Sequence, residues 1–354
     1  MRSVLKRFST GAAVLAVTAG LAACGGSDDD TTTAAASGGS AGGSVPKLTI
    51  GVIPSTLQSE TLQHYVDYLK KTCEPVGCEV DVRDPAGDPA KMGQAMQALV
   101  TKKVDAIALM ALDAGPFAQQ LQAAKTADIP VVSLGFRGDP KSTEQFDFTL
   151  ADNADQNGAA LGEWIAANKK DDPIAAGRVK TNFAGDILVT SAGKELESKG
   201  LKYADTRDSD LADLVNSVVK NTTAQVQKIK GPFTLVHHCD CAPPIIQPIL
   251  DRLNRKDVTI ATQYLPPATK KLIQAGSSIA VVDTDGYQHV FDLVDRLLAW
   301  KAGGELNTKD DIRTNRLKIV TKDNLPTGDD TFPFAADLEK QAAEWKSTYG
   351  GATR

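Results

Sequence analysis

From Lys47 onward, continuous apolar runs alternate along the chain with segments whose apolar residues recur at helical spacing. Residues 48–53 are a run of the first kind, typical of a strand that is buried on both faces of its sheet. Residues 61–71 are of the second kind and predict an amphipathic helix. The alternation continues to residue 134, with strands expected at 78–82, 104–109 and 129–134 and helices at 88–103 and 117–127. This order predicts parallel βαβ units with right-handed crossovers.

After a break near residues 145–155, the same alternation begins again. The pattern is weak between residues 171 and 210, where we expect short strands at 178–183 and 186–190. Elsewhere in this part it predicts strands at 146–150, 233–237, 258–262, 279–282 and 317–320 and helices at 157–167, 211–229, 245–253, 267–274, 290–300 and 335–345. Two series of βα units over about 300 residues predict two doubly wound lobes.

The N-terminus has the features of an export signal. Three cations stand within residues 2–7, and an apolar run follows at 12–23 that is too short to span a bilayer. The run ends in Leu-Ala-Ala-Cys at Cys24, which resembles the lipobox of bacterial lipoproteins, where this cysteine carries the lipid anchor. An ordinary signal peptide with a chance cysteine is the alternative. We therefore expect a signal peptide at 1–23 and a protein anchored at the outer face of the cell membrane, or periplasmic.

Residues 24–46 are rich in glycine, serine, threonine and alanine, a composition that cannot bury apolar area and predicts a flexible tether. The chain carries a formal charge of -5 and has no basic tract, so nucleic acid is not an expected partner. We expect the folded part to be a monomer.

The folded region resembles the ribose-binding-like class of periplasmic binding proteins, the sugar-type substrate-binding proteins of ABC transporters. The stretches that carry the resemblance are 48–57, 88–91, 105–109 with Asp113, 129–133, and 151–153 with 158–162. It implies the type I periplasmic-binding-protein fold, an α/β fold of two doubly wound parallel-sheet lobes that are joined by three crossover strands and close on a ligand by hinge motion. On this basis we expect an N-terminal lobe at 47–150 and 284–316, a C-terminal lobe at 151–283 and 317–325, and a C-terminal extension at 326–354.

Ligands of such folds lie beyond the carboxyl ends of the strands. Transferred position by position, the resemblance implies the ligand-binding residues Thr56, Ser59, Thr61, Phe136, Arg137, Asp152, Lys194, Cys239, Asp240, Tyr264 and Asp283. Lys194 ends a stretch, 190–194, that resembles a loop with a cationic contact. The ring-stacking aromatics of the family's sugar binders are replaced here by Thr61 and Leu62. This departure argues against a simple pentose, and Arg137 suits a carboxylate or phosphate, so the expected ligand is a small polar molecule, sugar or sugar-like, with an anionic group left open.

Two groups of cysteines invite different chemistry. Cys73 and Cys78 flank a short Pro- and Gly-containing loop, and in an oxidising compartment we expect a disulfide between them, with two buried free thiols as the alternative. The segment from His237 to Cys241 combines imidazoles and thiols, which suit zinc or copper, but the usual spacing of paired zinc ligands is absent. A metal site, a Cys-x-Cys disulfide and a ligand loop with unusual side chains stay open, the last being favoured.

Catalytic motifs are missing from the sequence: it has no nucleophile elbow, P-loop or dinucleotide fingerprint. His64 and His289 lie near the starts of expected helices, and we expect both at the surface. We therefore expect no enzyme and no cofactor, but a protein that captures a small molecule between its lobes and delivers it to an ABC permease. A sensory protein that serves a membrane receptor, and a metal or redox lipoprotein that uses the His237–Cys241 segment, are the alternatives.

Overall fold

A computed structural model describes residues 44–351 except 139, 180–182, 211–212, 239, 315 and 328–336. The expected signal peptide, Cys24, most of the expected tether and Cys239 lie outside the described residues. Among the helices that are described, none combines the length and the apolar character needed to cross a membrane.

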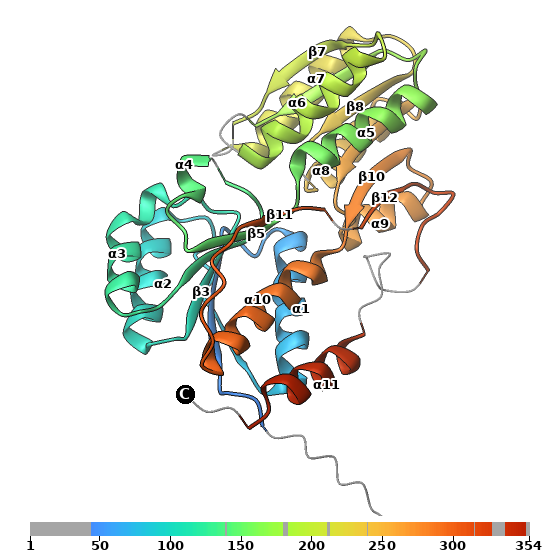
Figure 1. Cartoon of the computed structure of the whole chain (residues 1–354). Coiled ribbons are helices and arrows are strands. Elements are labelled where there is room, and N and C mark those ends of the chain that lie inside the picture. Colours follow the sequence, from blue (N-terminus) through green and yellow to red (C-terminus); the bar gives the residue numbers. More distant parts are fainter. Residues whose placement is uncertain are drawn as a thin grey trace, which may run out of the picture. The chain divides into compact units, whose positions relative to one another are not determined.

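The first lobe is built on a parallel sheet with the strand order β11-β5-β4-β3-β1-β2 (Figure 1). Helices α1 and α10 cover one face of this sheet, and helices α2 and α3 cover the other. The strands are β1 (Thr49–Pro54), β2 (Glu79–Val82), β3 (Ala106–Met110), β4 (Val131–Gly135), β5 (Phe148–Ala151) and β11 (Asp311–Ile312). The helices are α1 (Glu60–Cys73), α2 (Pro89–Lys102), α3 (Ala118–Thr126), the short α4 (Pro140–Thr143), α10 (Gly286–Lys301) and the 3-10 turns η1 (Glu74–Val76) and η2 (Gly115–Phe117).

The second lobe repeats this plan with the strand order β12-β10-β9-β8-β6-β7, in which only β12 runs antiparallel to its described neighbour. Helices α5 and α6 cover one face, and α7, α8 and α9 cover the other. The strands are β6 (Ile174–Arg178), β7 (Tyr203–Asp208), β8 (Phe233–His237), β9 (Val258–Gln263), β10 (Ile279–Thr284) and β12 (Leu317–Val320). The helices are α5 (Ala154–Asn168), α6 (Phe183–Ser198), α7 (Leu214–Lys228), α8 (Ala242–Arg252) and α9 (Pro267–Gln274). The predicted class of two doubly wound α/β lobes is confirmed.

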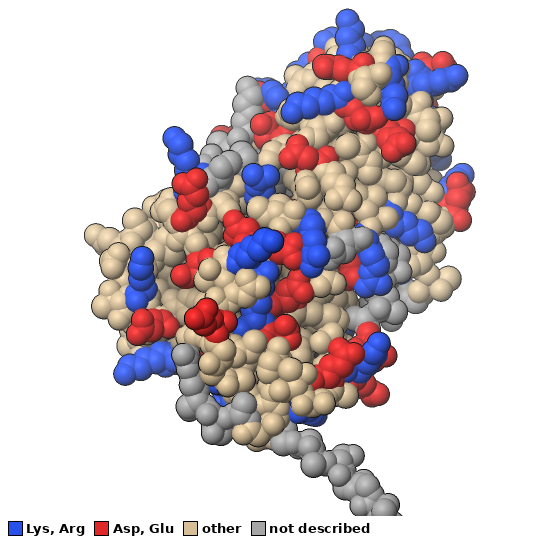
Figure 2. All heavy atoms as spheres, viewed as in Figure 1, with Lys and Arg blue, Asp and Glu red and all other residues tan. Residues whose placement is uncertain are grey.

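Apolar clusters on both faces of each sheet explain why the strands are continuous apolar runs. Ile50 and Val52 of β1 belong to the cluster under α1 and α10, whereas Ile53 belongs to the cluster under α2 and α3. Successive side chains of a strand point to opposite faces, so a strand covered on both sides must be apolar throughout. Figure 2 shows cations interspersed with acidic side chains over the visible face of the molecule.

Three chain segments connect the lobes: one after β5, one after β10, and one between β11 and β12. Backbone and side-chain hydrogen bonds join them to one another. The N–H of Asn153 donates to the Thr314 hydroxyl at 3.0 Å, and the N–H of Asp285 donates to the carbonyl of Arg316 at 3.3 Å. The three connections therefore run side by side, as the expected crossovers require.

The strand predicted at 178–183 falls largely on residues 180–182, which lie outside the described residues, and β6 ends at residue 178. The strand predicted at 186–190 is wrong, because the apolar run 187–189 belongs to helix α6. This helix packs closely on α5 at two glycines, since a Cβ at Gly158 would stand 2.4 Å from the carbonyl oxygen of Leu188, and one at Gly162 would stand 2.7 Å from that of Ala192. A helix buried this closely shows a short apolar run that periodicity alone cannot distinguish from a strand.

The final helix, α11 (Leu338–Tyr349), packs against α1, η1 and α10 of the first lobe. Trp345 is buried there and donates its indole N–H to Asp295 at 2.9 Å, and the Tyr349 hydroxyl donates to the same carboxylate at 2.9 Å. Next to this helix, a disulfide joins Cys73 to Cys78 with 4.8 Å between their Cα atoms. The C-terminal part of the chain thus completes the first lobe.

Candidate functional site

The two lobes contact each other through residues at the carboxyl ends of their strands. The hydroxyl of Thr61, in the first turn of α1, donates to the Asp240 carboxylate, which follows β8. The Glu60 carboxylate accepts from the N–H of Ala268, in the first turn of α9, at 2.8 Å. This is the edge at which ligands bind to doubly wound sheets, so we take the interlobe region as the candidate site.

Three aromatic rings line this region. The Phe136 ring, which follows β4, lies 5.7 Å from the Tyr65 ring of α1 and 5.7 Å from the Tyr264 ring of the second lobe. Tyr65 is completely buried, and two glycines leave room for it, because a Cβ at Gly135 or Gly286 would stand 3.0 or 3.1 Å from its ring.

Tyr65 was missed from the sequence, where the interlobe region was expected to lack aromatic rings next to Thr61. Its signal was its spacing: Tyr65 stands four positions after Thr61 and therefore on the same face of the helix. Phe136 and Tyr264, both predicted as site residues, do lie at the region where the lobes meet.

The buried polar atoms in this region that have no hydrogen-bond partner among the described residues include two oxygens, Oη of Tyr65 and Oδ2 of Asp283. The other Asp283 oxygen accepts from the N–H of Leu265 at 3.2 Å. Burial raises the pKa of Asp283 well above its usual range, and burial followed by the nearby Asp152 carboxylate does the same to the pKa of Tyr65. Burial also raises the pKa of Asp240, although the hydrogen bond from Thr61 opposes this shift.

Asp152 is surrounded by protein donors. Its Oδ1 lies 3.0 Å from Nε2 of His289, and its Oδ2 accepts from the hydroxyls of Thr284 at 2.7 Å and Tyr264 at 3.2 Å. The expectation that His289 lies at the surface is wrong, because its side chain is 2% exposed. His64, for which we had the same expectation, is half-buried on α1.

A pair of stacked histidines lies at the end of β8. The rings of His237 and His238 are 5.0 Å apart, and both side chains are buried. Burial lowers the pKa of His237 well below its usual range and lowers that of His238 to about 4. Both rings are therefore neutral near pH 7. Cys241, three positions after His238, is half of a disulfide whose other cysteine lies outside the described residues. Within the described part of the chain, no three His, Cys, Asp or Glu side chains form a group that could hold a metal ion.

The remaining predicted site residues have local roles or positions. Thr56 accepts from the N–H of Gln58 at 3.1 Å, and Ser59 caps α1 by accepting from the N–H of Leu62 at 3.3 Å. Arg137 is half-buried directly after Phe136. The loop predicted at 190–194 is wrong, because these residues continue helix α6, and Lys194 is exposed on it.

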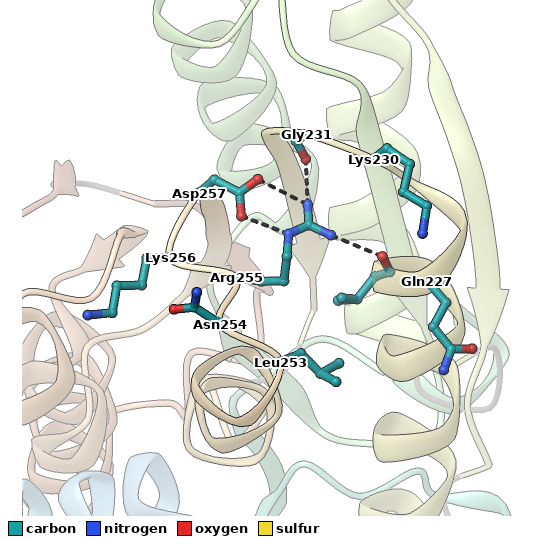
Figure 3. Close-up of a pocket in the computed structure, with 9 residues that line it drawn as sticks. Gln227, Lys230, Gly231, Leu253, Asn254, Arg255, Lys256 and Asp257 are labelled. Atoms are coloured by element: carbon teal, nitrogen blue, oxygen red, sulfur yellow. Dashed lines mark hydrogen bonds and ion pairs between the residues drawn. The ribbon is translucent and has the colours of Figure 1, made fainter.

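A surface hollow of about 690 Å³ lies elsewhere, between the turns that precede β8 and β9 (Figure 3). Arg255 spans it and donates to the carbonyls of Val226 at 3.0 Å and Ile229 at 3.1 Å, to the carbonyl of Gly231, and to the Asp257 carboxylate at 2.7 Å. This arginine therefore holds the turns together. The hollow stands at the amino ends of the strands, opposite the edge where the lobes meet, and does not belong to the candidate site.

Two doubly wound lobes that meet at the carboxyl ends of their strands, with three connections between them, define the two-lobed class of solute-binding folds. The family model described as "Periplasmic binding protein domain" matches residues 50–304, and the chain belongs to this family. No curated protein sequence matches the chain.

Solved structures of this class are similar in fold at low sequence identity. An ABC transporter periplasmic solute-binding protein from Actinobacillus succinogenes 130z, with bound D-allose, has a TM-score of 0.68 and 15% identity over 78% of this chain and 98% of its own. A solute-binding protein from Burkholderia graminis C4D1M, in complex with D-arabinose, has a TM-score of 0.68 and 19% identity over 79% of this chain and 97% of its own. A solute-binding protein from Bacillus halodurans C-125, with bound myo-inositol, has a TM-score of 0.65 and 17% identity over 85% of this chain and 99% of its own.

Proposed function

We propose that this protein captures a small polyhydroxylated solute, a sugar or sugar-like molecule, between its lobes and delivers it to an ABC importer without changing it chemically. The observation that carries the proposal is the pair of unpartnered polar atoms, Oη of Tyr65 and Oδ2 of Asp283, buried where the lobes meet. A buried polar group without a partner costs about 1–3 kcal/mol, which a ligand hydroxyl would relieve.

The chemistry of the surrounding side chains favours a ligand rich in hydroxyl groups. Carboxylate and phenol oxygens pair well with hydroxyl hydrogens, and aromatic rings such as Phe136 offer apolar faces to the C–H groups of a sugar ring. If the ligand carries an anionic group, we expect that group to pair with the guanidinium of Arg137, which directly follows Phe136 in the chain.

The structural neighbours support the same ligand class, because three proteins of this fold bind D-allose, D-arabinose and myo-inositol. All three ligands are neutral polyols.

The cellular setting is also part of the proposal. The lipobox-like sequence at Cys24 supports a lipid anchor on the outer face of the membrane, and the periplasmic-binding-protein family supports an ABC permease as partner of the monomer. Reconstitution with a candidate ABC permease from the same organism would show solute uptake if the protein serves import, whereas binding without uptake would favour the sensory role.

Thermal unfolding with D-allose, D-arabinose and myo-inositol tests the proposal directly. A bound ligand stabilises the folded protein by mass action, by about 2.7 kcal/mol at a hundredfold excess over Kd. Asp283→Asn should lose most of this stabilisation, and Asp257→Asn, at the hollow of Figure 3, should keep it. Absence of a shift across these sugars and a wider polyol panel would contradict the proposal.

A further inference from the structure

Three donors converge on the carboxylate of Asp152, and all four side chains are buried. Oδ1 lies within hydrogen-bond distance of His289 at 3.0 Å. Oδ2 accepts from Thr284 at 2.7 Å and from Tyr264 at 3.2 Å. The exposed fractions are 5% for Asp152, 5% for Tyr264, 2% for His289 and 0% for Thr284. With both oxygens engaged by the protein, the orientation of this carboxylate is set without a ligand.

The donors belong to different parts of the molecule. His289 lies on α10, which packs against α1 in the first lobe, and Thr284 ends β10 at the second connection between the lobes. Asp152 directly follows β5, at the first connection. Tyr264 directly follows β9 and belongs to the second lobe. The cluster therefore joins both lobes and two of the segments that must bend when the lobes move.

Tyr264 adopts a backbone conformation that needs an explanation. Its φ is +59°, in the left-handed region that bulky side chains rarely occupy. Its N–H donates to the carbonyl of Val282 at 2.9 Å, and the edge of its ring meets Phe136 across the lobe boundary. Strained backbone of this kind persists where the surrounding contacts require one side-chain position, and it is frequent at ligand clamps and switches.

We propose that Tyr264 and Asp152 form an interlobe latch, in which the Tyr264 hydroxyl binds Asp152 when the lobes are closed and leaves it when they open. His289 keeps Asp152 with the first lobe, while Tyr264 moves with the second. Asp152, expected from the sequence to contact the ligand, is then a positioning residue that acts through Tyr264. The inference rests on the proposed function only in that closure serves ligand capture.

Small-angle X-ray scattering of the ligand-free protein tests the latch. Tyr264→Phe keeps the ring beside Phe136 and removes the hydroxyl, so we expect a larger radius of gyration and a broader distance distribution than in the unmodified protein. Tyr203→Phe is the matched control, because the hydroxyl of the half-buried Tyr203 donates to the Val189 carbonyl at 2.8 Å within the second lobe. The control should lose a similar amount of thermal stability and scatter like the unmodified protein.

Identical scattering of Tyr264→Phe, Tyr203→Phe and the unmodified protein would overturn the latch, whatever their stabilities. His289→Leu supplies a second arm: it removes the donor that ties Asp152 to the first lobe and should also broaden the distance distribution, whereas an unchanged distribution counts against the assignment.

Binding kinetics separate the latch from the choice of ligand. With D-allose as probe, Tyr264→Phe should raise the dissociation rate about tenfold and leave the association rate within about twofold, because one interlobe hydrogen bond to a charged group is lost only in the closed form. A fall in the association rate of similar size to the rise in the dissociation rate would contradict the latch, which acts only after the lobes have closed. Because the scattering experiment needs no ligand, it decides on the latch even if D-allose does not bind, and the proposed sugar class is then decided separately by the thermal-unfolding panel.

Discussion

Thr61 and Asp240 stand 179 positions apart in the chain, and a hydrogen bond from the threonine hydroxyl to the aspartate joins the two lobes. Thr61 starts the helix that carries Tyr65, and Asp240 follows the two stacked histidines. The contact is one of the places where closure brings an acidic side chain into a poorly solvated position, and the first prediction depends on it.

Thr61→Val should destabilise the protein by about 1–3 kcal/mol at pH 7, because it removes the donor from a buried carboxylate. Burial already raises the pKa of Asp240, and loss of the Thr61 hydrogen bond should raise it further. The loss of stability should be smaller at pH 4 than at pH 7, because the raised pKa of Asp240 favours its protonation at the lower pH. Urea denaturation at both pH values checks this, with Thr101→Val as the control because the Thr101 hydroxyl bonds only to the Gln97 carbonyl of its own helix. Equal losses at the two pH values would refute the electrostatic explanation.

Asp283→Asn should stabilise the ligand-free protein at neutral and higher pH and weaken ligand binding. The pKa of Asp283 is raised in the folded state, so the folded protein holds more protons than the unfolded chain above pH 4. Its stability therefore falls as the pH rises from the unfolded pKa to the folded one, by up to about 1.4 kcal/mol per pH unit.

The asparagine removes this dependence and keeps an oxygen for the Leu265 N–H. Asp257→Asn should have the opposite effect and lower the stability slightly. Arg255 holds the pKa of Asp257 below its usual value, and the substitution removes this surface ion pair. A pH profile of Asp283→Asn parallel to that of the unmodified protein would be the negative result.

His238→Gln should reduce the acid sensitivity of the protein. Burial lowers the pKa of His238 to about 4, so the folded state holds fewer protons than the unfolded chain between pH 6.5 and 4. This contribution to stability is present above pH 6.5 and is lost as the pH falls toward 4, with a total of about 3 kcal/mol. Chemical denaturation across this range should give a flatter profile for His238→Gln. His64→Gln changes the same residue type at a half-buried position of α1. An equal flattening of the pH profile in this variant would show that His238 is not the cause of the acid sensitivity.

Replacing Cys73 and Cys78 together by serine should lower the free energy of unfolding by about 2 kcal/mol, the value expected for closing a loop of this short length. The double substitution is preferable to a reducing agent, which would also attack the disulfide of Cys241. Guanidinium denaturation of the two proteins provides the measurement. No difference between them would mean that packing of α11 on η1 already restrains this loop.

The sequence pattern was sufficient for the fold because strands and helices alternate with strong periodicity in most of the chain. It failed at residues 187–189, where the close approach of α6 to the glycines of α5 buries a short apolar run that only the tertiary structure explains. Local pattern does not report how closely two helices pack.

The sequence predicted residues of the candidate site at the ends of strands: Phe136 and Tyr264 directly follow β4 and β9, and Asp283 lies near the end of β10. It was not predictable for Tyr65 and His289, which lie on helices and are drawn into the site by packing against the other elements. Their burial depends on residues far away in the sequence, such as Gly135 beside Tyr65 and Asp152 beside His289.

The first lobe is assembled from both ends of the chain, and this affects the order in which an exported polypeptide can fold. Strand β5 pairs with β11, which begins only at residue 311, and α1 is packed against α11, which begins only at residue 338. The Gly351 N–H donates to the carbonyl of Ser44 at 3.2 Å. Contacts of such long sequence separation form slowly. By contrast, strands β6 to β10 of the second lobe follow one another without interruption by the first. The lobe whose strands come first in the chain is therefore the last to be completed, and its apolar helix face needs protection until helix α11 has been added.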